Sequence, residues 1–344
     1  MIHSIIPDSI INQFKELIIK SEQISLITHP NPDGDALGSS LAFYHALRGL
    51  NKRVKVIVPN FFPSFLNWMP GSDEIMVFDQ QMRKTESFIH HSDLIICLDF
   101  NTLKRIERIS PAIQQSKATL VLVDHHIDPD PVFDLAVSYT IASSTCELVY
   151  DLIDNMGFLP EFSLDLASCI YVGIMTDTGS FSYSCNHSRP YEITAKLVEQ
   201  GLDVARIHNL VYDTFSENRL RLLGYLLNRR MKIIPEYNAA YISLSMADQK
   251  KYDFQIGDSE GIVNYALSIQ GIRFAAFFTE KAELVRVSLR SKGDLSVNQL
   301  ARKYYQGGGH RNAAGGNSYS TLRKTENAFI RLLIENKELL QHEN

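Results

Sequence analysis

Histidines and aspartates recur in several short segments along residues 29–177 of this chain. The residue types that suit a metal site are His29, Asp33, Asp35, Asp99, His125 and Asp177. Carboxylate oxygens and imidazole nitrogens are ligands for hard or borderline divalent cations. An aspartate shared by two such ions can hold them about 3.5–4 Å apart, the arrangement used for phosphoryl chemistry. The pattern therefore predicts a site for two divalent cations that acts on phosphate esters.

The segments around these residues resemble the motif blocks of the DHH phosphoesterase family and come in the same order. Asp124, His125 and His126 spell the DHH motif itself; the other blocks are THPNPDGDALGSS, ICLDF and GIMTDTGSF. Near the other end, GGGHRNAAGG at residues 307–316 is similar to the signature of the first type of DHH-associated domain. The resemblance covers nearly the whole chain. Its two-domain layout is most similar to the branch of nanoRNases and phosphatases of 3'-phosphoadenosine 5'-phosphate (pAp).

The resemblance implies a role for each proposed ligand. His29 and Asp33 would bind one ion, Asp35, His125 and Asp177 the other, and Asp99 would bridge the two. Manganese is the expected ion, although magnesium, cobalt or zinc could take its place. Taken alone, the segment around Asp33 is more typical of an Asx turn that caps a helix. Two bridged ions lower the pKa of a shared water, so no side-chain nucleophile is needed.

Two further residues of the DHH motif are predicted to take part in catalysis. The resemblance implies that His126 faces the substrate, where it would hydrogen-bond the phosphate or protonate the leaving oxygen. Asp124 is expected to orient His125.

A second set of residues is expected to bind the substrate. Gly307, Gly308 and Gly309 would let the backbone approach a ligand closely, with amides directed at phosphate oxygens where a following helix begins. His310 matches the family block. Arg290 is the best candidate for a bidentate phosphate contact, and Arg311 is a weaker one. The alternatives are a structural tight turn and a solvated basic rim.

The elements that would position these residues predict an α/β fold. Apolar runs at Ile24–Thr28, Val54–Val58, Leu94–Leu98 and Thr119–Val123 alternate with helical patterns such as Ala36–Leu50 and Thr145–Met156. This alternation predicts a parallel sheet with helices on both faces. The proposed ligands after the strands would then lie beyond the carboxyl ends of neighbouring strands. Asp177 would instead follow a buried helix, Leu164–Thr176.

The predicted domains are a catalytic metal-binding domain at residues 1–188, a helical linker at 189–230 and a smaller α/β substrate-binding domain at 231–344. In the last, strands are expected at Ala239–Ser245, Ile272–Thr279 and Leu284–Leu289. Helices are expected near Glu260–Leu267, after His310 and from Thr321 onward.

The charge of the chain is uneven. Residues 1–217 contain 15 Lys and Arg against 27 Asp and Glu, whereas residues 218–344 contain 19 against 12. Bound cations would neutralise part of the acidic excess, and the basic part could attract an anionic substrate. No apolar run approaches the length of about 18 residues that a membrane helix needs, so a cytoplasmic protein with no membrane partner is expected.

The resemblance implies hydrolysis of short oligoribonucleotides (nanoRNA) to mononucleotides, of pAp to AMP, or of both. A linear or cyclic dinucleotide phosphodiesterase is one alternative, and an exopolyphosphatase or pyrophosphatase is another. A nucleotide-binding module without activity is the alternative from a different class. The order of preference among substrates, the direction of degradation and a homodimeric state are left open.

Overall fold

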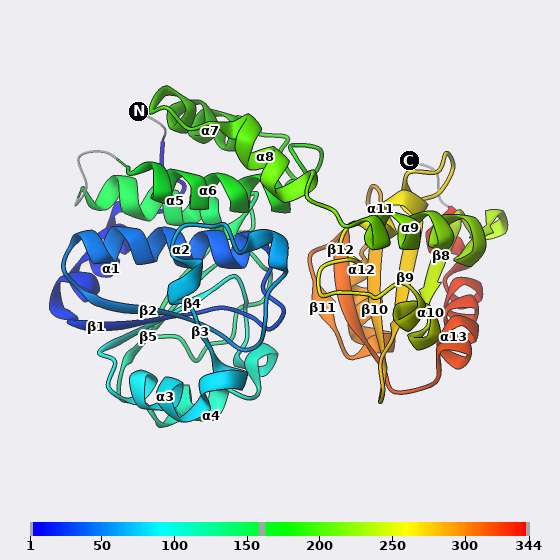
Figure 1. Cartoon of the computed structure of the whole chain (residues 1–344), viewed down its shortest axis with the longest axis horizontal. Coiled ribbons are helices and arrows are strands. Elements are labelled where there is room, and N and C mark those ends of the chain that lie inside the picture. Colours follow the sequence, from blue (N-terminus) through cyan, green and yellow to red (C-terminus); the bar gives the residue numbers. More distant parts are fainter. Residues whose placement is uncertain (1–2, 158–161, 342–344) are drawn as a thin grey trace. The chain divides into compact units, whose positions relative to one another are not determined.

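Two compact units make up the protein, a computed structural model of which describes residues 3–157 and 162–341 (Figure 1). The first unit is Met1–Thr214 and the second is Phe215–Asn344. Helices α7 (Arg189–Glu199) and α8 (Val204–Tyr212) thus belong to the first unit, and α9 (Glu217–Tyr225) belongs to the second. The predicted domain bounds at 188 and 231 stay a prediction.

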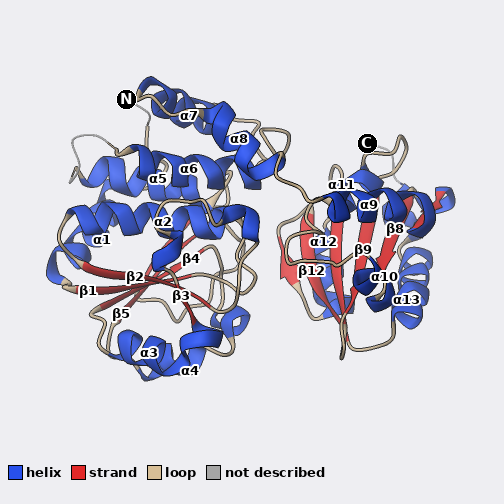
Figure 2. Ribbon diagram, viewed as in Figure 1, coloured by secondary structure: helices blue, strands red, loops and turns tan. Residues whose placement is uncertain are grey.

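A six-stranded parallel sheet forms the centre of the first unit, as predicted (Figure 2). Its strand order is β3-β2-β1-β4-β5-β6. The strands are β1 (Gln23–Ile27), β2 (Arg53–Val58), β3 (Met76–Val77), β4 (Leu94–Leu98), β5 (Thr119–Asp124) and β6 (Leu135–Ser138). The predicted strands match β1, β2, β4 and β5 to within one residue at each end.

Helices cover both faces of this sheet, which confirms the predicted fold class. The α-helices of this unit are α1 (Asp8–Lys20), α2 (Gly34–Gly49), α3 (Phe78–His90), α4 (Ser110–Gln115), α5 (Thr145–Met156), α6 (Leu164–Asp177), α7 and α8. The helices α3 and α4 lie on one face, and α1, α2 and α5 lie on the other (Figure 1). Helix α6 packs on α2 and α5, and α7 packs on α5 and α6.

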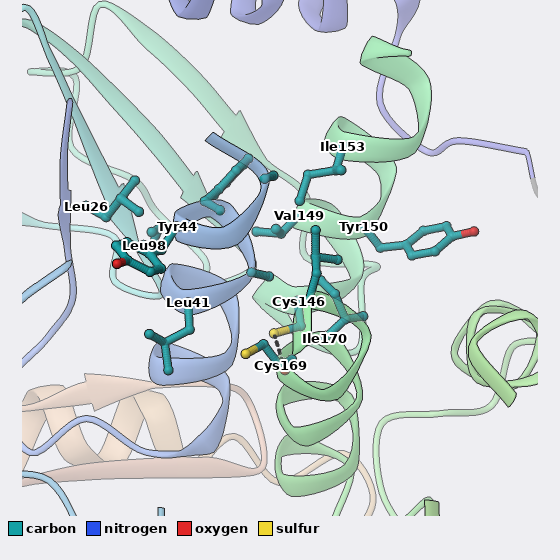
Figure 3. Close-up of a cluster of buried hydrophobic side chains, with 14 of the residues drawn as sticks. Leu26, Leu41, Tyr44, Leu98, Cys146, Val149, Tyr150, Ile153, Cys169 and Ile170 are labelled. Carbon is teal, nitrogen blue, oxygen red and sulfur yellow. Dashed lines mark hydrogen bonds between the residues drawn. The ribbon is translucent and has the colours of Figure 1, made fainter. Parts of the chain in front are cut away.

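Helix α2 lies between the sheet and the pair α5 and α6, so it is buried on nearly every side (Figure 3). Leu26 and Leu98 of the sheet face Leu41 of α2, while Cys146 of α5 and Cys169 of α6 lie on the other side of that helix (Figure 3). A helix in this environment must be apolar or small all round. Residues 36–43 meet that requirement, because they are apolar or small and the two serines among them bond to carbonyls of their own helix.

The second unit contains a mixed six-stranded sheet of order β11-β12-β10-β9-β8-β7. Its strands are β7 (Met231–Ile234), β8 (Ala239–Leu244), β9 (Phe274–Glu280), β10 (Val285–Ser291), β11 (Gly308–Gly309) and β12 (Ala313–Ser318). Alternate residues of β9 face two cores: Phe274 and Phe278 pack on α12 (Val297–Tyr305) and α13 (Leu322–Glu335), and Phe277 packs on α11 (Ile262–Leu267). The remaining helices are α9, α10 (Met246–Lys251) and α14 (Lys337–Gln341).

The predicted helix after His310 is wrong. Residues 313–318 form β12, which pairs with β10 along its whole length, and the next helix begins only at Leu322. Among the described residues, no helix combines the length and the apolar character that crossing a membrane requires.

Candidate metal centre and active site

The order of the parallel strands reverses between β1 and β4, and ligand sites of doubly wound sheets lie at such a reversal, beyond the carboxyl ends of the strands. His29 is the second residue after β1, and Asp99 directly follows β4. His125 directly follows β5, and Asp177 is the last residue of α6. The structure therefore brings together at one edge the residues that the sequence spreads over 149 positions.

His29, Asp33 and Asp99 form the first of two adjacent groups of metal-ligand type. The His29 Nε2 atom lies 3.3 Å from Asp99 Oδ2 and 4.0 Å from Asp33 Oδ1. Asp33 also caps α2, since its Oδ1 accepts from the backbone N–H groups of Asp35 and Ala36. The helix-cap interpretation and the ligand interpretation of this segment are thus compatible.

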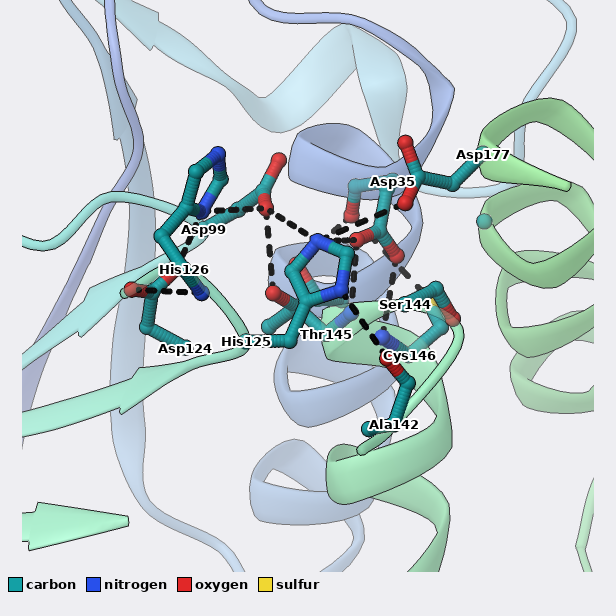
Figure 4. Close-up of polar contacts among 12 residues, drawn as sticks. Asp35, Asp99, Asp124, His125, His126, Ala142, Ser144, Thr145, Cys146 and Asp177 are labelled. Carbon is teal, nitrogen blue, oxygen red and sulfur yellow. Dashed lines mark hydrogen bonds and ion pairs between the residues drawn. The ribbon is translucent and has the colours of Figure 1, made fainter. Parts of the chain in front are cut away.

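Asp35, His125 and Asp177 form the second group (Figure 4). The His125 Nε2 atom lies 3.8 Å from Asp35 Oδ2 and 3.4 Å from Asp177 Oδ2. The same nitrogen lies 3.6 Å from Asp99 Oδ1. One oxygen of Asp99 therefore faces His29 and the other faces His125, which is the placement that a carboxylate shared between two ions needs.

The N-terminus of α5 fixes two of these carboxylates. Asp35 Oδ2 accepts from Thr145 N at 2.6 Å, and Asp35 Oδ1 accepts from Cys146 N at 2.9 Å (Figure 4). The Thr145 hydroxyl donates to Asp99 Oδ1 at 3.0 Å. Sequence reasoning did not find Thr145 or Cys146, because two of these three donors are backbone groups that any residue could supply.

The expectation that Asp124 orients His125 is wrong. Asp124 Oδ1 accepts from His126 Nδ1 at 2.7 Å, whereas His125 Nδ1 lies 3.3 Å from the Ala142 carbonyl. The cause is the backbone turn after β5: the His126 N–H also donates to Asp124 Oδ2, which brings the second histidine rather than the first over the aspartate.

Arg105 is a residue of this site that sequence reasoning missed. Its Nη1 atom lies 3.4 Å from His126 Nε2. It lies in the segment η3 (Leu103–Ile106), six residues beyond Asp99 in the same loop. Its signal in the sequence was a lone basic residue downstream of ICLDF, which by itself is typical of a solvated surface.

The electrostatics of the cluster indicate an excess of negative charge. Burial and the nearby charges of Asp99 and Asp177 raise the pKa of Asp35 well above its usual range. Burial alone would lower the pKa of His125, but Asp177, Asp35 and Asp99 raise it to about 9. Burial works against ionisation of Asp99 too, yet the hydrogen bond and charge of His29 hold its pKa below the usual range. Bound cations would relieve this repulsion, and the Asp/His donor set fits divalent ions.

A close approach between two helices explains the glycine at residue 34. A Cβ atom there would lie 2.4 Å from Thr176 Oγ1 and 2.6 Å from Thr176 Cγ2. The start of α2, which presents Asp35, can therefore meet the end of α6, which presents Asp177, only if residue 34 has no side chain.

The second unit brings Arg290, Gly308 and Gly309 of the predicted substrate-binding residues onto strands of one sheet. Arg290 of β10 is paired with Ala313 of β12, and Gly308 and Gly309 of β11 pair with the same strand. Gly307 N donates to Ala301 O and His310 N donates to Ala313 O, so these two amides are already hydrogen-bonded within the protein backbone. The expected helix start after these glycines is wrong, because β12 follows them and the next helix begins at Leu322; a phosphate contact by the amides of Gly308 and Gly309 stays a prediction. Arg311 is mostly exposed and bonds Asp294 at 2.7 Å.

Fold and site together define a doubly wound α/β enzyme with a histidine and aspartate centre suited to divalent cations. Residues 23–174 match the DHH family, N-terminal domain, and residues 238–338 match the DHHA1 domain. The chain belongs to the DHH family and is a phosphoric ester hydrolase.

Two relatives match over most of their length. The chain is 28% identical over 300 residues to a Bacillus subtilis protein named bifunctional oligoribonuclease and PAP phosphatase NrnA, a match that covers 87% of this chain and 90% of the relative. The crystal structure of an exopolyphosphatase-related protein from Bacteroides fragilis is 42% identical, covers 99% of this chain and 100% of its own, and has a TM-score of 0.94.

The structure of RecJ in complex with Mn²⁺ from Thermus thermophilus shares the fold. It has a TM-score of 0.55 and 14% identity, covers 96% of this chain and is itself covered over 55% of its length.

Proposed function

We propose that this protein is a metal-dependent phosphoesterase that hydrolyses short oligoribonucleotides to mononucleotides and pAp to AMP. The observation on which the proposal depends is the pair of histidine and aspartate groups at the switch point of the sheet, where Asp99 belongs to the first group and lies 3.6 Å from His125 of the second. The substrate class is supported by the Bacillus subtilis relative, whose name describes an oligoribonuclease and PAP phosphatase.

Two divalent cations, most simply Mn²⁺, would occupy the two groups. His29 and Asp33 would hold one, Asp35, His125 and Asp177 would hold the other, and Asp99 would contact both. Bound ions would supply an activated water and neutralise charge on the phosphate. The protein contributes the placement of the carboxylates: the backbone amides of Thr145 and Cys146 hold Asp35, and the Thr145 hydroxyl bonds Asp99.

His126 and Arg105 are proposed to act on the phosphate ester. Asp124 holds the proton on His126 Nδ1, so that Nε2 is the atom that exchanges a proton with the leaving oxygen. Arg105 lies next to that nitrogen, where its guanidinium can bind a non-bridging phosphate oxygen. Arg290 and His310 are proposed to bind the anionic end of the nucleotide, with Gly307, Gly308 and Gly309 giving close access and Arg311 adding positive charge.

The test is a product profile in the presence of Mn²⁺ for pAp, a short 5'-phosphorylated RNA, linear and cyclic dinucleotides, pyrophosphate and polyphosphate. We expect AMP from pAp and mononucleotides from the RNA, with activity lost on chelation and restored by Mn²⁺ better than by Ca²⁺. Full activity of metal-free protein, checked by elemental analysis, would contradict the metal dependence. Hydrolysis of neither pAp nor RNA would contradict the substrate class.

Exopolyphosphatase activity is a second candidate, because the Bacteroides fragilis structure that is 42% identical is described as exopolyphosphatase-related. The same profile distinguishes the two. Release of phosphate from polyphosphate at a kcat/KM above that for pAp and RNA would favour this candidate over the first.

A further inference from the structure

The first turn of α5 contacts the proposed metal ligands through three donors. Both oxygens of Asp35 are held by the backbone amides of Thr145 and Cys146, and Asp99 accepts from the Thr145 hydroxyl. Residues 143–147 are buried throughout. Any shift of this turn would therefore move or release carboxylates of both metal groups.

Glu147 holds that turn in place. Its Oε2 atom accepts from both the backbone N–H and the hydroxyl of Ser143, each at 2.8 Å. In return, Glu147 N donates to the hydroxyl of Ser144, the residue that caps the helix. The side chain of Glu147 is 0% exposed. A buried carboxylate therefore holds the chain just before α5, at Ser143, which lies two residues before Thr145 and three before Cys146.

A single arginine from another helix balances this carboxylate. Arg189, the first residue of α7, donates from Nε to Glu147 Oε1 at 2.8 Å. Its Nη2 atom donates to Asp151 Oδ1 at 2.5 Å, one turn further along α5, and Nη1 donates to the His3 carbonyl. Glu147 and Asp151 are both almost fully buried, and the Arg189 side chain is 12% exposed.

We infer that Glu147, held by Arg189, is a positioning residue for the metal centre: it sets the turn whose amides orient Asp35 and whose Thr145 hydroxyl bonds Asp99. This inference rests on the proposed function, since it assigns Asp35 and Asp99 to metal binding. Groups that orient the ligands of a metal typically affect its affinity by about 10–100-fold.

Asp151 provides a matched comparison. It bonds the same arginine, lies on the same helix and is equally buried, but its Oδ2 atom accepts from Ile5 N and Ser4 Oγ, not from the turn at Ser143. A network that only stabilised the fold would make the two carboxylates equivalent. A positioning role makes Glu147 different from Asp151.

The experiment compares Glu147→Gln with Asp151→Asn in the full chain. An amide has only one acceptor oxygen, so each substitution removes the hydrogen bonds that one of the two carboxylate oxygens accepts. The volume of the side chain stays nearly constant. Lys196→Met is a second control, because it removes the α7 to α5 ion pair with Asp154, far along α5 from the turn. The readouts are the dissociation constants for Mn²⁺ by calorimetry without substrate, the EPR spectrum of bound Mn²⁺, and the melting temperature.

We expect Glu147→Gln to raise the Mn²⁺ dissociation constant by about tenfold and to alter the EPR spectrum. Glu147→Gln and Asp151→Asn should lower the melting temperature by similar amounts. Asp151→Asn and Lys196→Met should both leave the affinity for Mn²⁺ within about twofold of the wild type. If Glu147→Gln does not fold, Ser143→Ala tests the same contact, with an expected rise in the constant of about threefold.

Equal loss of Mn²⁺ affinity in Glu147→Gln and Asp151→Asn, or unchanged affinity in Glu147→Gln, would overturn the inference and leave the proposed function intact. A wild-type protein that binds no Mn²⁺ would overturn the proposed function, and the inference with it.

Discussion

Asp99 is the residue on which both proposed metal groups depend, and its backbone is unusual. Its φ of 63° lies in the left-handed region, which asparagine and aspartate tolerate better than other non-glycine residues. We expect Asp99→Asn, which keeps this conformation and the approximate shape, to lower kcat on every phosphoester substrate by about a thousandfold. Loss of the shared charge is the cause, and the fold should be retained, as measured by steady-state kinetics and circular dichroism.

Asp128→Asn is the control for this substitution, because Asp128 is an exposed aspartate that also has a positive φ, of 56°. It should retain wild-type kinetics. A wild-type rate and metal content in Asp99→Asn would show that no ion depends on this carboxylate.

His125 gives a second expectation at the residue scale. Its pKa of about 9 in the metal-free protein lies above the unfolded value near 6.5, so the stability that its proton confers is present below about pH 6.5 and lost as pH rises through about 9. A cation that binds Nε2 must displace the proton. We expect Mn²⁺ binding near pH 7.5 to release close to one proton from this residue, measured as a dependence of the calorimetric enthalpy on buffer ionisation enthalpy. An enthalpy that is the same in all buffers would contradict this.

Arg105 is proposed to contact substrate, not metal, and the two roles separate experimentally. Arg105→Met removes one charge-assisted contact, worth about 1.5–3 kcal/mol, so kcat/KM for pAp should fall roughly ten- to a hundredfold. Affinity for Mn²⁺ should not fall, because the positive charge of Arg105 lies near the proposed metal ligands and repels cations, and the substitution removes it. The exposed neighbour Lys104→Met is the control. A large loss of Mn²⁺ affinity in Arg105→Met would show that the side chain supports the metal centre instead.

At the scale of elements, the sequence predicted best where burial dictates composition. Strands such as β4 are continuous apolar runs because a parallel sheet covered on both faces exposes neither side. The strand β12 was missed because AAGGNS has two glycines and no β-branched residue; its pairing with β10 makes it a strand, and local preference does not.

Contacts within the site were predicted less well than the set of residues that gather in it. Residue type alone marks His29 or Asp177 as a candidate ligand. The partner of Asp124 depends instead on how the chain turns after β5, and the donors to Asp35 are backbone groups of α5. Neither the turn after β5 nor a backbone donor produces a pattern of residue types in the sequence. The sequence could therefore predict which residues come together in the site, but not which of them orient the others.

The contact between α2 and α6 leads to a prediction about Gly34. Gly34→Ala would force a methyl group against Thr176, and such overpacking typically costs about 1–3 kcal/mol. We expect a lower midpoint of urea unfolding together with weaker Mn²⁺ binding, since Asp35 and Asp177 lie on the two elements pushed apart. Adding Thr176→Ala removes the two closest atoms and should restore part of both losses.

Gly224→Ala is the matched control, because no atom lies within 4 Å of a Cβ placed at that helical residue. It should stabilise the protein by up to about 1 kcal/mol through the higher helix propensity of alanine. A stabilising effect of Gly34→Ala as well would mean that the two helices can separate without cost.

For the whole molecule, the uneven charge follows the division of the chain into two units. The acidic excess lies in the part that contains the candidate metal ligands, and the positive excess lies in the part that contains Arg290 and His310. The two units would therefore have separate roles: the first unit would perform hydrolysis, and the second would bind the nucleotide. Such a division predicts that substitutions in the second unit affect substrates according to whether they carry a nucleotide.

Arg290→Ala and His310→Ala should therefore impair hydrolysis of pAp and short RNA far more than hydrolysis of bis(p-nitrophenyl) phosphate, which offers an ester but no nucleotide. Loss of one charge-assisted contact lowers kcat/KM for the nucleotide substrates roughly ten- to a hundredfold. Arg323→Ala, at an exposed arginine of α13, controls for the loss of positive charge alone. Equal losses on the aryl ester would mean that Arg290 and His310 act on the metal centre or the fold, because the aryl ester has no nucleotide for these residues to bind.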